Sequence, residues 1–414
     1  MKSSLSLLII SWFIISDSFG SITLKDSFEA ARLNMESIKR AEAVINQGQE
    51  RKNIARAAIL PNISGIGSHT NIDAPDTSNG NSPFQLTRQY SAALRLTQPL
   101  LRGGTLSAYE LAKENILLSR FQKDSTELNL YQLVINAYFN LSVAQIDKKN
   151  VEELLKYSRE RVREIRERTN IGRSRKGELV EAEAQLLTAE SQYQQTIISL
   201  SQAERIFEFY TKLKAEEIGE LGEVPKLTTS LEEYKLQLRS RPDIQATRQE
   251  TRIAQKQIDI SKGGHFPSVD LTGNYYFDRT GVLATSEWDV GIAVVIPLFQ
   301  GGGVQASVRE AVEGKRIAEL RSSETLRAAE RDIAINYQNI IHLQEQLKVL
   351  KKALAKAEEA YKLNKKDYQY GLVTNLDVLQ SLNIFIETKR AYNSLVSITH
   401  LNYKNLEASI GVLP

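Results

Sequence analysis

The chain is 414 residues long and 42% of it is hydrophobic, which is enough to bury a large core. It contains no cysteine, which excludes disulfides, thiolate metal sites and a lipid anchor on an N-terminal cysteine. The 53 Lys and Arg and 50 Asp and Glu are interspersed and give a net charge of only +3, so nothing favours nucleic acid as a partner. Beyond the N-terminus no apolar run is long enough for a membrane-spanning helix. A membrane crossing would therefore require strands.

Residues 1–20 have the pattern of a secretory signal peptide. A basic start at Lys2 is followed by an apolar run over residues 5–15 and by small residues around Gly20. A buried N-terminal helix or strand is the alternative, but such a helix would show polar residues at helical spacing, and residues 7–10 show none. We expect the mature chain to begin near Ser21 and to be exported, which for a chain without disulfides fits the bacterial envelope.

Three short motifs occur twice, in the same order, in the two halves of the chain. The pairs are residues 60–63 with 266–269, 98–104 with 296–302, and 172–179 with 371–378. The duplication predicts two tandem structural repeats, each with a helix, two paired strands, a long helix, a turn and a returning helix. We place the repeats at residues 21–210 and 242–414, joined by an irregular link at 211–241.

Four segments alternate between apolar and polar residues, as strands with one apolar face do. We expect these strands at about residues 62–72, 89–98, 268–278 and 288–296. The strands of the second pair are each about as long as a tilted transmembrane strand. Phe277 and Trp288 flank the loop of that pair, where aromatic side chains would meet a membrane interface, although aromatics are also common in strands generally.

Most of the remaining sequence predicts helices with seven-residue apolar seams, which are typical of helices packed as coiled coils. Long helices are expected at about residues 104–170 and 304–370, each on the order of 100 Å long at about 1.5 Å per residue. Returning helices are expected at about residues 178–210 and 376–411.

The number of strands constrains the assembly. Four strands cannot close a barrel alone, and an open edge in lipid leaves backbone polar groups unpaired. We therefore expect identical chains around one axis to share a barrel stacked on a helical tube, with the polar strand faces toward the lumen.

From Leu24 to Leu413 the chain resembles the TolC-like outer-membrane efflux proteins. The resemblance is carried by the two proline-bounded strand pairs, each followed by a glycine pair and a long helix, by Arg241-Pro242-Asp243 at the start of the second repeat, and by the segment 368–379. It implies a mainly α fold with a membrane β-barrel portion: a homotrimer with a twelve-stranded β-barrel continuous with a twelve-helix α-barrel. It also implies three partners, namely outer membrane lipid, a periplasmic adaptor protein and an inner-membrane transporter.

The resemblance also places a periplasmic gate. By position, Glu178 and Tyr368 resemble the acidic and tyrosine members of a closing network, and Asp377 resembles the first of two acidic rings. Three copies of Asp377 around an axis would attract cations. Alternatively, the carboxylate of Asp377 only stabilises its own helix, because it lies near the positive N-terminal end. Val373 and Gln380 stand where relatives have an arginine of the lock and a second aspartate. The lock is then weaker, or is made differently through residues such as Arg173, Arg175 or Lys176.

Two short turns lie at the far ends of the long helices, and nothing else is expected to reach a periplasmic partner first. We expect these turns to be the docking tips for the adaptor. Their residues are Ile171, Gly172, Arg173 and Ser174 in the first turn, and Gly371, Leu372, Val373 and Thr374 in the second.

No constellation of residues points to catalysis, so we expect no catalytic residue, no cofactor and no metal. His69, His265, His342 and His400 lack metal-ligand spacing, and no Lys-Ser or Lys-Thr follows the glycine pairs as a phosphate loop would need. The arginine-rich run at residues 159–168 contains glutamates and is typical of a solvated helix face with mixed-sign pairs.

The function expected from these features is that of a passive exit duct of a tripartite efflux or type I secretion system. It would lie in the outer membrane, with its helical tunnel in the periplasm, and pass small molecules or proteins. A soluble coiled-coil scaffold is the alternative, which the signal peptide and the amphipathic strands oppose. A periplasmic enzyme is a third possibility, for which the sequence offers no nucleophile, base or metal cluster.

Overall fold

The computed structural model describes residues 22–71, 88–215, 217–219, 221–280 and 284–414. The signal peptide expected at residues 1–20 and the last residue of the first expected strand, Ile72, lie outside these residues.

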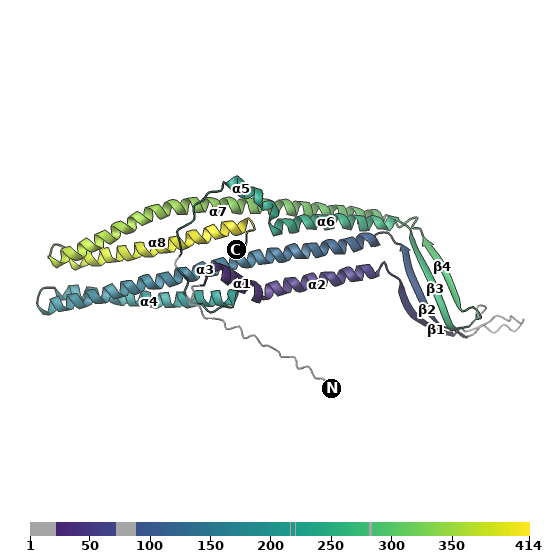
Figure 1. The fold of residues 1–414 in the computed structure, drawn as a ribbon, viewed down its shortest axis with the longest axis horizontal. Coiled ribbons are helices and arrows are strands. Elements are labelled where there is room, and N and C mark those ends of the chain that lie inside the picture. The colour runs from purple at the N-terminus through teal and green to yellow at the C-terminus, as the bar shows by residue number, and fades with distance from the viewer. Residues whose placement is uncertain (1–21, 72–87, 216, 220, 281–283) are drawn as a thin grey trace, which may run out of the picture.

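Long helices run side by side from a sheet at one end of the molecule to two turns at the other (Figure 1). The described helices are α1 (Leu24–Asn34), α2 (Glu36–Ala57), α3 (Thr105–Asn170), α4 (Lys176–Thr211), α5 (Leu231–Gln237), α6 (Pro242–Lys262), α7 (Gly303–Gln369) and α8 (Asn375–Ser409), with short turns of 3-10 helix, η1 (Leu238–Ser240) and η2 (Gly263–His265). The 66 residues of α3 and the 67 of α7 each span about 100 Å at about 1.5 Å per residue. None of the described helices combines the length and the apolar character needed to cross a membrane.

The helices pack as antiparallel hairpins, with α4 returning along α3 and α8 returning along α7. The buried residues Ala182, Ala189, Thr196 and Ala203 of α4 follow one another at intervals of seven. This interval keeps one face of the helix turned toward its partner, as in a coiled coil. Thr196 interrupts the alanine series without leaving an unpaired hydroxyl, because its Oγ1 donates to the backbone oxygen of Tyr193 at 2.7 Å.

The middle of the molecule holds the largest described core. Phe28 and Ala31 of α1 pack there among buried residues of α3, including Tyr131 and Val134. The link at 211–241, expected to be irregular, contains α5 and η1. Ser230 and Glu233 form a capping box that starts α5, so local hydrogen bonds stabilise a helix too short to show an apolar seam.

The four strands form one antiparallel sheet in the order β1 (Asn62–Asn71), β2 (Arg88–Leu101), β3 (Ser268–Arg279), β4 (Trp288–Val295). Its register aligns residues of like character, so that Leu94, Tyr275 and Trp288 lie in one row across three strands. Strand β2 runs three residues beyond the expected end at residue 98, and its pairing becomes irregular between Pro99 and Leu101. Proline has no N–H to donate to the ladder, which explains the irregularity.

Glycines allow the sheet and the helices to meet closely. Gly104 adopts a φ of 84° at the start of α3, a conformation that favours glycine. A Cβ on Gly103 would lie 1.8 Å from the backbone oxygen of Gly263, at the end of α6. The glycine pair therefore serves the strand-to-helix junction, as its lack of a phosphate-loop signature suggested.

Candidate functional site at the helical tips

Both hairpin turns at the end far from the sheet are built alike. Gly172 and Gly371 have φ values of 72° and 74°, in the left-handed region that terminates helices. The next residue along each turn donates its N–H back into the long helix, Arg173 to Arg168 at 2.7 Å and Leu372 to Asp367 at 3.0 Å. Ile171 and Leu372 are exposed apolar side chains at these turns.

Tyr368 of α7 is buried and contacts three residues of the first hairpin. Its hydroxyl lies 3.2 Å from the hydroxyl of Ser174, in the turn between α3 and α4. The guanidinium carbons of Arg161 and Arg168 lie 3.8 Å and 4.6 Å from its ring centroid, which is cation–π distance. The tyrosine assigned to the gate therefore joins the two helical hairpins within one chain.

Arg161 extends this cluster to α8. Its side chain is only 6% exposed; Nε donates to Asn375 Oδ1 at 2.8 Å and Nη1 to Glu164 Oε2 at 2.9 Å. Asn375, fully buried at the start of α8, donates in turn to the backbone oxygen of Glu178 at 3.5 Å. The cluster thus contains residues of both hairpins.

The interpretation of residues 159–168 as a solvated helix face with mixed-sign pairs was wrong at Arg161, whose side chain is buried. Exposed ion pairs do occur in this run, as between Arg166 and Glu183 at 2.8 Å. Arg161, however, occupies the buried seam of α3, which follows the 3-4 spacing through Val151, Leu154, Ser158, Arg161 and Ile165. That spacing is present in the sequence and could have identified Arg161 despite the surrounding charges.

The other residues considered for the lock lie outside the cluster of Arg161 and Tyr368. The carboxylate of Glu178 accepts from Arg175 Nε at 3.3 Å, a contact within the first turn of α4. Arg173 and Lys176 are exposed. Among the residues that the structure describes, the guanidinium groups within cation–π distance of Tyr368 belong to Arg161 and Arg168 of α3.

Asp377 forms a capping box at the start of α8. Its Oδ2 accepts from the backbone N–H of Thr374 at 2.7 Å, and its own N–H donates to Thr374 Oγ1 at 3.3 Å. The hydrogen bond from the Thr374 hydroxyl, followed by that from the backbone, lowers the pKa of Asp377. The side chain is exposed and lines an open depression of about 510 Å³ with Val373 and Gln380. Asp377 therefore stabilises the start of α8 within a single chain, without any contribution from other copies.

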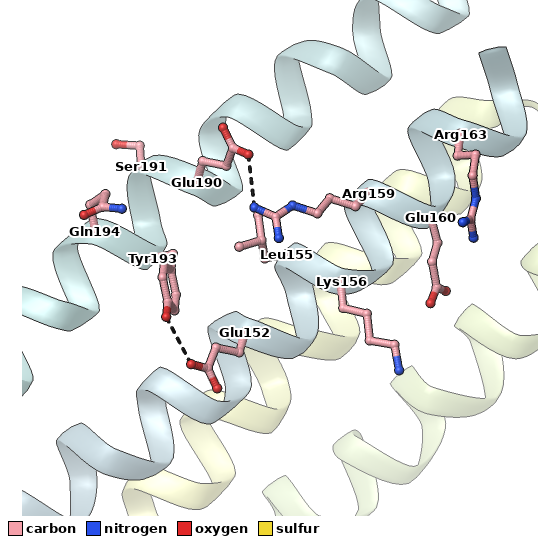
Figure 2. A pocket seen from close by; sticks show the side chains of 10 residues that line it. All are labelled: Glu152, Leu155, Lys156, Arg159, Glu160, Arg163, Glu190, Ser191, Tyr193 and Gln194. Carbon is pink, nitrogen blue, oxygen red and sulfur yellow. Dashed lines mark hydrogen bonds and ion pairs between the residues drawn. The ribbon is translucent and has the colours of Figure 1, made fainter.

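An open groove of about 880 Å³ runs between α3 and α4 (Figure 2). Its walls carry both signs of charge, and two contacts cross it: Arg159 Nη2 to Glu190 Oε1 at 3.4 Å, and the Tyr193 hydroxyl to Glu152 Oε1 at 3.1 Å. The groove is a polar surface on the side of the first hairpin.

The sheet carries the two expected interface aromatics. Phe277 and Trp288 are 65% and 66% exposed, and Trp288 lies opposite Tyr275 in the ladder. On the alternate positions, Arg95 Nε donates to Asn274 Oδ1 at 2.9 Å and Asn274 Nδ2 to Asp289 Oδ1 at 2.7 Å. One face is thus apolar and the other carries a polar row across three strands.

Within the described part of the chain, no group of three or more His, Cys, Asp or Glu residues could hold a metal ion. His400 stacks on Phe139 with ring centroids 6.3 Å apart, and its Nε2 lies 3.0 Å from the backbone oxygen of Gly222. Burial lowers the pKa of His400, as expected for a histidine that packs inside the molecule.

Comparison with known proteins identifies the class of protein to which this chain belongs. Residues 28–205 and 234–412 match the outer membrane efflux protein family, and the chain belongs to that family. It is 24% identical to the toluene efflux pump outer membrane protein TtgC of Pseudomonas putida over 391 residues, covering 90% of this chain and 79% of TtgC. It is 24% identical to the outer membrane protein TolC of Escherichia coli over 433 residues, covering 94% of this chain and 82% of TolC.

The fold agrees with this assignment. The crystal structure of the outer membrane protein VceC from Vibrio cholerae superposes with a TM-score of 0.81 at 21% identity, covering 94% of this chain and 96% of that one. The resemblance to TolC-like proteins is confirmed: the chain is an outer-membrane efflux channel with its helical part in the periplasm. The family consists of channels and not of enzymes, and membership gives no support to a soluble scaffold.

Proposed function

We propose that three copies of this chain form the exit duct of a tripartite efflux or type I secretion system. The observation that carries the proposal is the single four-stranded sheet, whose outer strands β1 and β4 each have one unpaired edge among the described strands. In lipid such edges must be paired, because unsatisfied backbone groups cost several kcal/mol each. Pairing β4 of one copy with β1 of the next would close three sheets of four strands into a twelve-stranded barrel.

The two faces of the sheet support this closure. Exposed apolar side chains, such as Val290 and Ile292, would face lipid, and the row of Arg95, Asn274 and Asp289 would face a watery lumen. Phe277 and Trp288 would then lie at the outer interface of the membrane, beside the hairpin loop.

The order of elements supports two tandem repeats. Helix α2, strands β1 and β2, and helices α3 and α4 correspond to α6, β3, β4, α7 and α8. Each chain would contribute two long hairpins to the tunnel, and three chains would form a twelve-helix α-barrel on the periplasmic side.

We place the gate and the partner surface at the end far from the sheet. Glu178, Tyr368 and Asp377 belong to the gate in this proposal, and the two glycine turns are the docking tips for a periplasmic adaptor. The mixed-charge groove between α3 and α4 offers a polar helix of the adaptor a second contact (Figure 2). An inner-membrane transporter would supply the energy.

Reconstitution of the full mature chain in planar lipid bilayers tests the proposal. We expect discrete single-channel currents, and restored export when the gene is returned to cells that lack it. Mild crosslinking in those cells should recover the adaptor through cysteines introduced at residue 173 or 372, because the chain has no other cysteine. Protein that inserts but never conducts would contradict the proposal.

A further inference from the structure

We infer that Arg161 is the positioning residue that holds the gate end closed, by fixing Tyr368 and Asn375 against the first hairpin. The inference rests on the proposed duct and adds the residue that stands in for the arginine missing at Val373. We call the contacts of Arg161 with Tyr368 and Asn375 the latch. Its arginine lies in the buried seam of α3, away from the exposed arginines of the turn.

The geometry shows that Arg161 connects elements that would have to separate. Helices α3 and α4 form one hairpin, and α7 and α8 form the other. Arg161 of the first hairpin stacks on Tyr368 of α7 and donates to Asn375 of α8. The bond from Asn375 to the Glu178 carbonyl and that between Ser174 and Tyr368 cross the same boundary. Moving the hairpins apart at the tip would break these contacts together.

The cost of this arrangement argues that Arg161 is more than a packing residue. Its Nη2 is buried without a hydrogen-bond partner, although nearly all buried polar groups in proteins have one. A charged group in a helical seam is also a poor way to gain stability, because an apolar side chain of similar volume often packs as well or better. A residue that only filled the seam would not need a guanidinium group.

A substitution at residue 161 separates a latch from a structural role. Arg161→Met keeps the volume and removes the charge, the stack and both hydrogen bonds. Glu164 would not be left as a buried lone charge, because it is partly exposed and also lies 3.8 Å from Arg168. Asn375 Oδ1 is fully buried and would lose its donor, so the assembled protein should melt at a somewhat lower temperature. Its channels in planar bilayers should be open on the order of tenfold more often than those of the parent.

Arg166→Met is the matched control, because it removes an arginine of the same helix whose ion pair with Glu183 stays within the first hairpin and is exposed. It should leave both the open probability and the melting temperature at the parent values. Channels of Arg161→Met that open no more often than the parent would overturn the latch. An equal rise in open probability in Arg166→Met would overturn it as well, since general loosening of α3 would then explain both.

A double-substitution cycle with Tyr368→Leu approaches the contact from the other hairpin and remains informative if Arg161→Met assembles poorly. If the two side chains act as one latch, the double variant should be no more open than the more open single variant. Additive increases would contradict the latch. A parent protein that forms no channel at all would instead refute the proposed duct, so the two failures are distinguishable.

Discussion

At the scale of single residues, Asp377 has two roles to separate. In one chain it caps α8, and in a threefold assembly it would add an acidic ring to the lumen. Asp377→Asn keeps the shape of the cap and removes the charge. If the ring exists, the variant should lose cation preference and block by trivalent cations in single-channel recordings. Unchanged selectivity would leave the capping box as its only role.

Tyr368→Phe removes the hydroxyl contact with Ser174 and keeps the ring under Arg161. A neutral hydrogen bond contributes about 1 kcal/mol, so the open probability should rise about fivefold, less than for Arg161→Met. Single-channel recordings of the two variants under one salt condition make the comparison. Equal effects of the two changes would mean that Arg161 contributes no more to closure than the single hydroxyl contact between Tyr368 and Ser174.

The family resemblance names Tyr368, whereas its contacts with Arg161 and Arg168 are visible only in the structure. Arg161 stands at a seam position that the sequence spacing contains, but it is surrounded by charges typical of a solvated surface. Only the tertiary structure shows that its seam position turns it toward Asn375, 214 residues away along the chain. The alternatives Arg173, Arg175 and Lys176 lie next to the first turn in sequence, and closeness in sequence does not determine contact between hairpins.

At the scale of elements, the junction between sheet and helices depends on the absence of side chains. A Cβ on Gly263 would lie 2.4 Å from the backbone nitrogen of Gly104, and backbone cannot move aside cheaply. Gly263→Ala should therefore destabilise the folded protein by about 1–3 kcal/mol, as overpacking typically does. The same change at Gly314, in the interior of α7 with open space around it, should stabilise by about 0.5–1 kcal/mol. Denaturant unfolding of both variants makes the test, and equal effects would refute the close junction.

The turn between α7 and α8 allows docking to be separated from folding. Gly371 has a positive φ with nothing within 4 Å of a Cβ, so the cost of a substitution is conformational and not steric. Gly371→Asp should abolish export with trimer yield intact, because it places a charge on the tip. Gly371→Asn, which adopts the left-handed region about as well, should retain most export. Loss of the trimer in both variants would show that the turn is structural and that docking is wrongly assigned.

Element types followed from local periodicity. The alternation from Val269 onward and the seams of the long helices are signals carried by each segment itself, and β3 and α8 lie where these patterns indicate. The link was harder to predict because α5 has 7 residues and depends on a cap and on burial of Tyr234. Short helices stabilised by tertiary contacts leave little periodic pattern.

At the scale of the whole molecule, the sequence predicted an outer-membrane channel, and family membership confirms that class. That class came from the resemblance to TolC-like proteins. The residues themselves indicate strands with one apolar face that are too few to close a barrel and therefore require neighbouring chains. The arrangement of those neighbours depends on surfaces that remain exposed in a single chain. Local sequence periodicity does not show how these surfaces pair. Exposed apolar residues on α7, such as Val349 and Leu363, are candidates for such contacts.

The most direct test of the shared barrel is the number of chains in the purified particle. Light scattering of the full mature protein in mild detergent, with the detergent contribution subtracted, gives the mass of the protein part alone. We expect three times the mass of one chain, because three four-stranded sheets pair their edges into one closed barrel. A protein mass equal to that of one chain, in a preparation that still conducts in bilayers, would contradict the shared barrel and with it the duct described here.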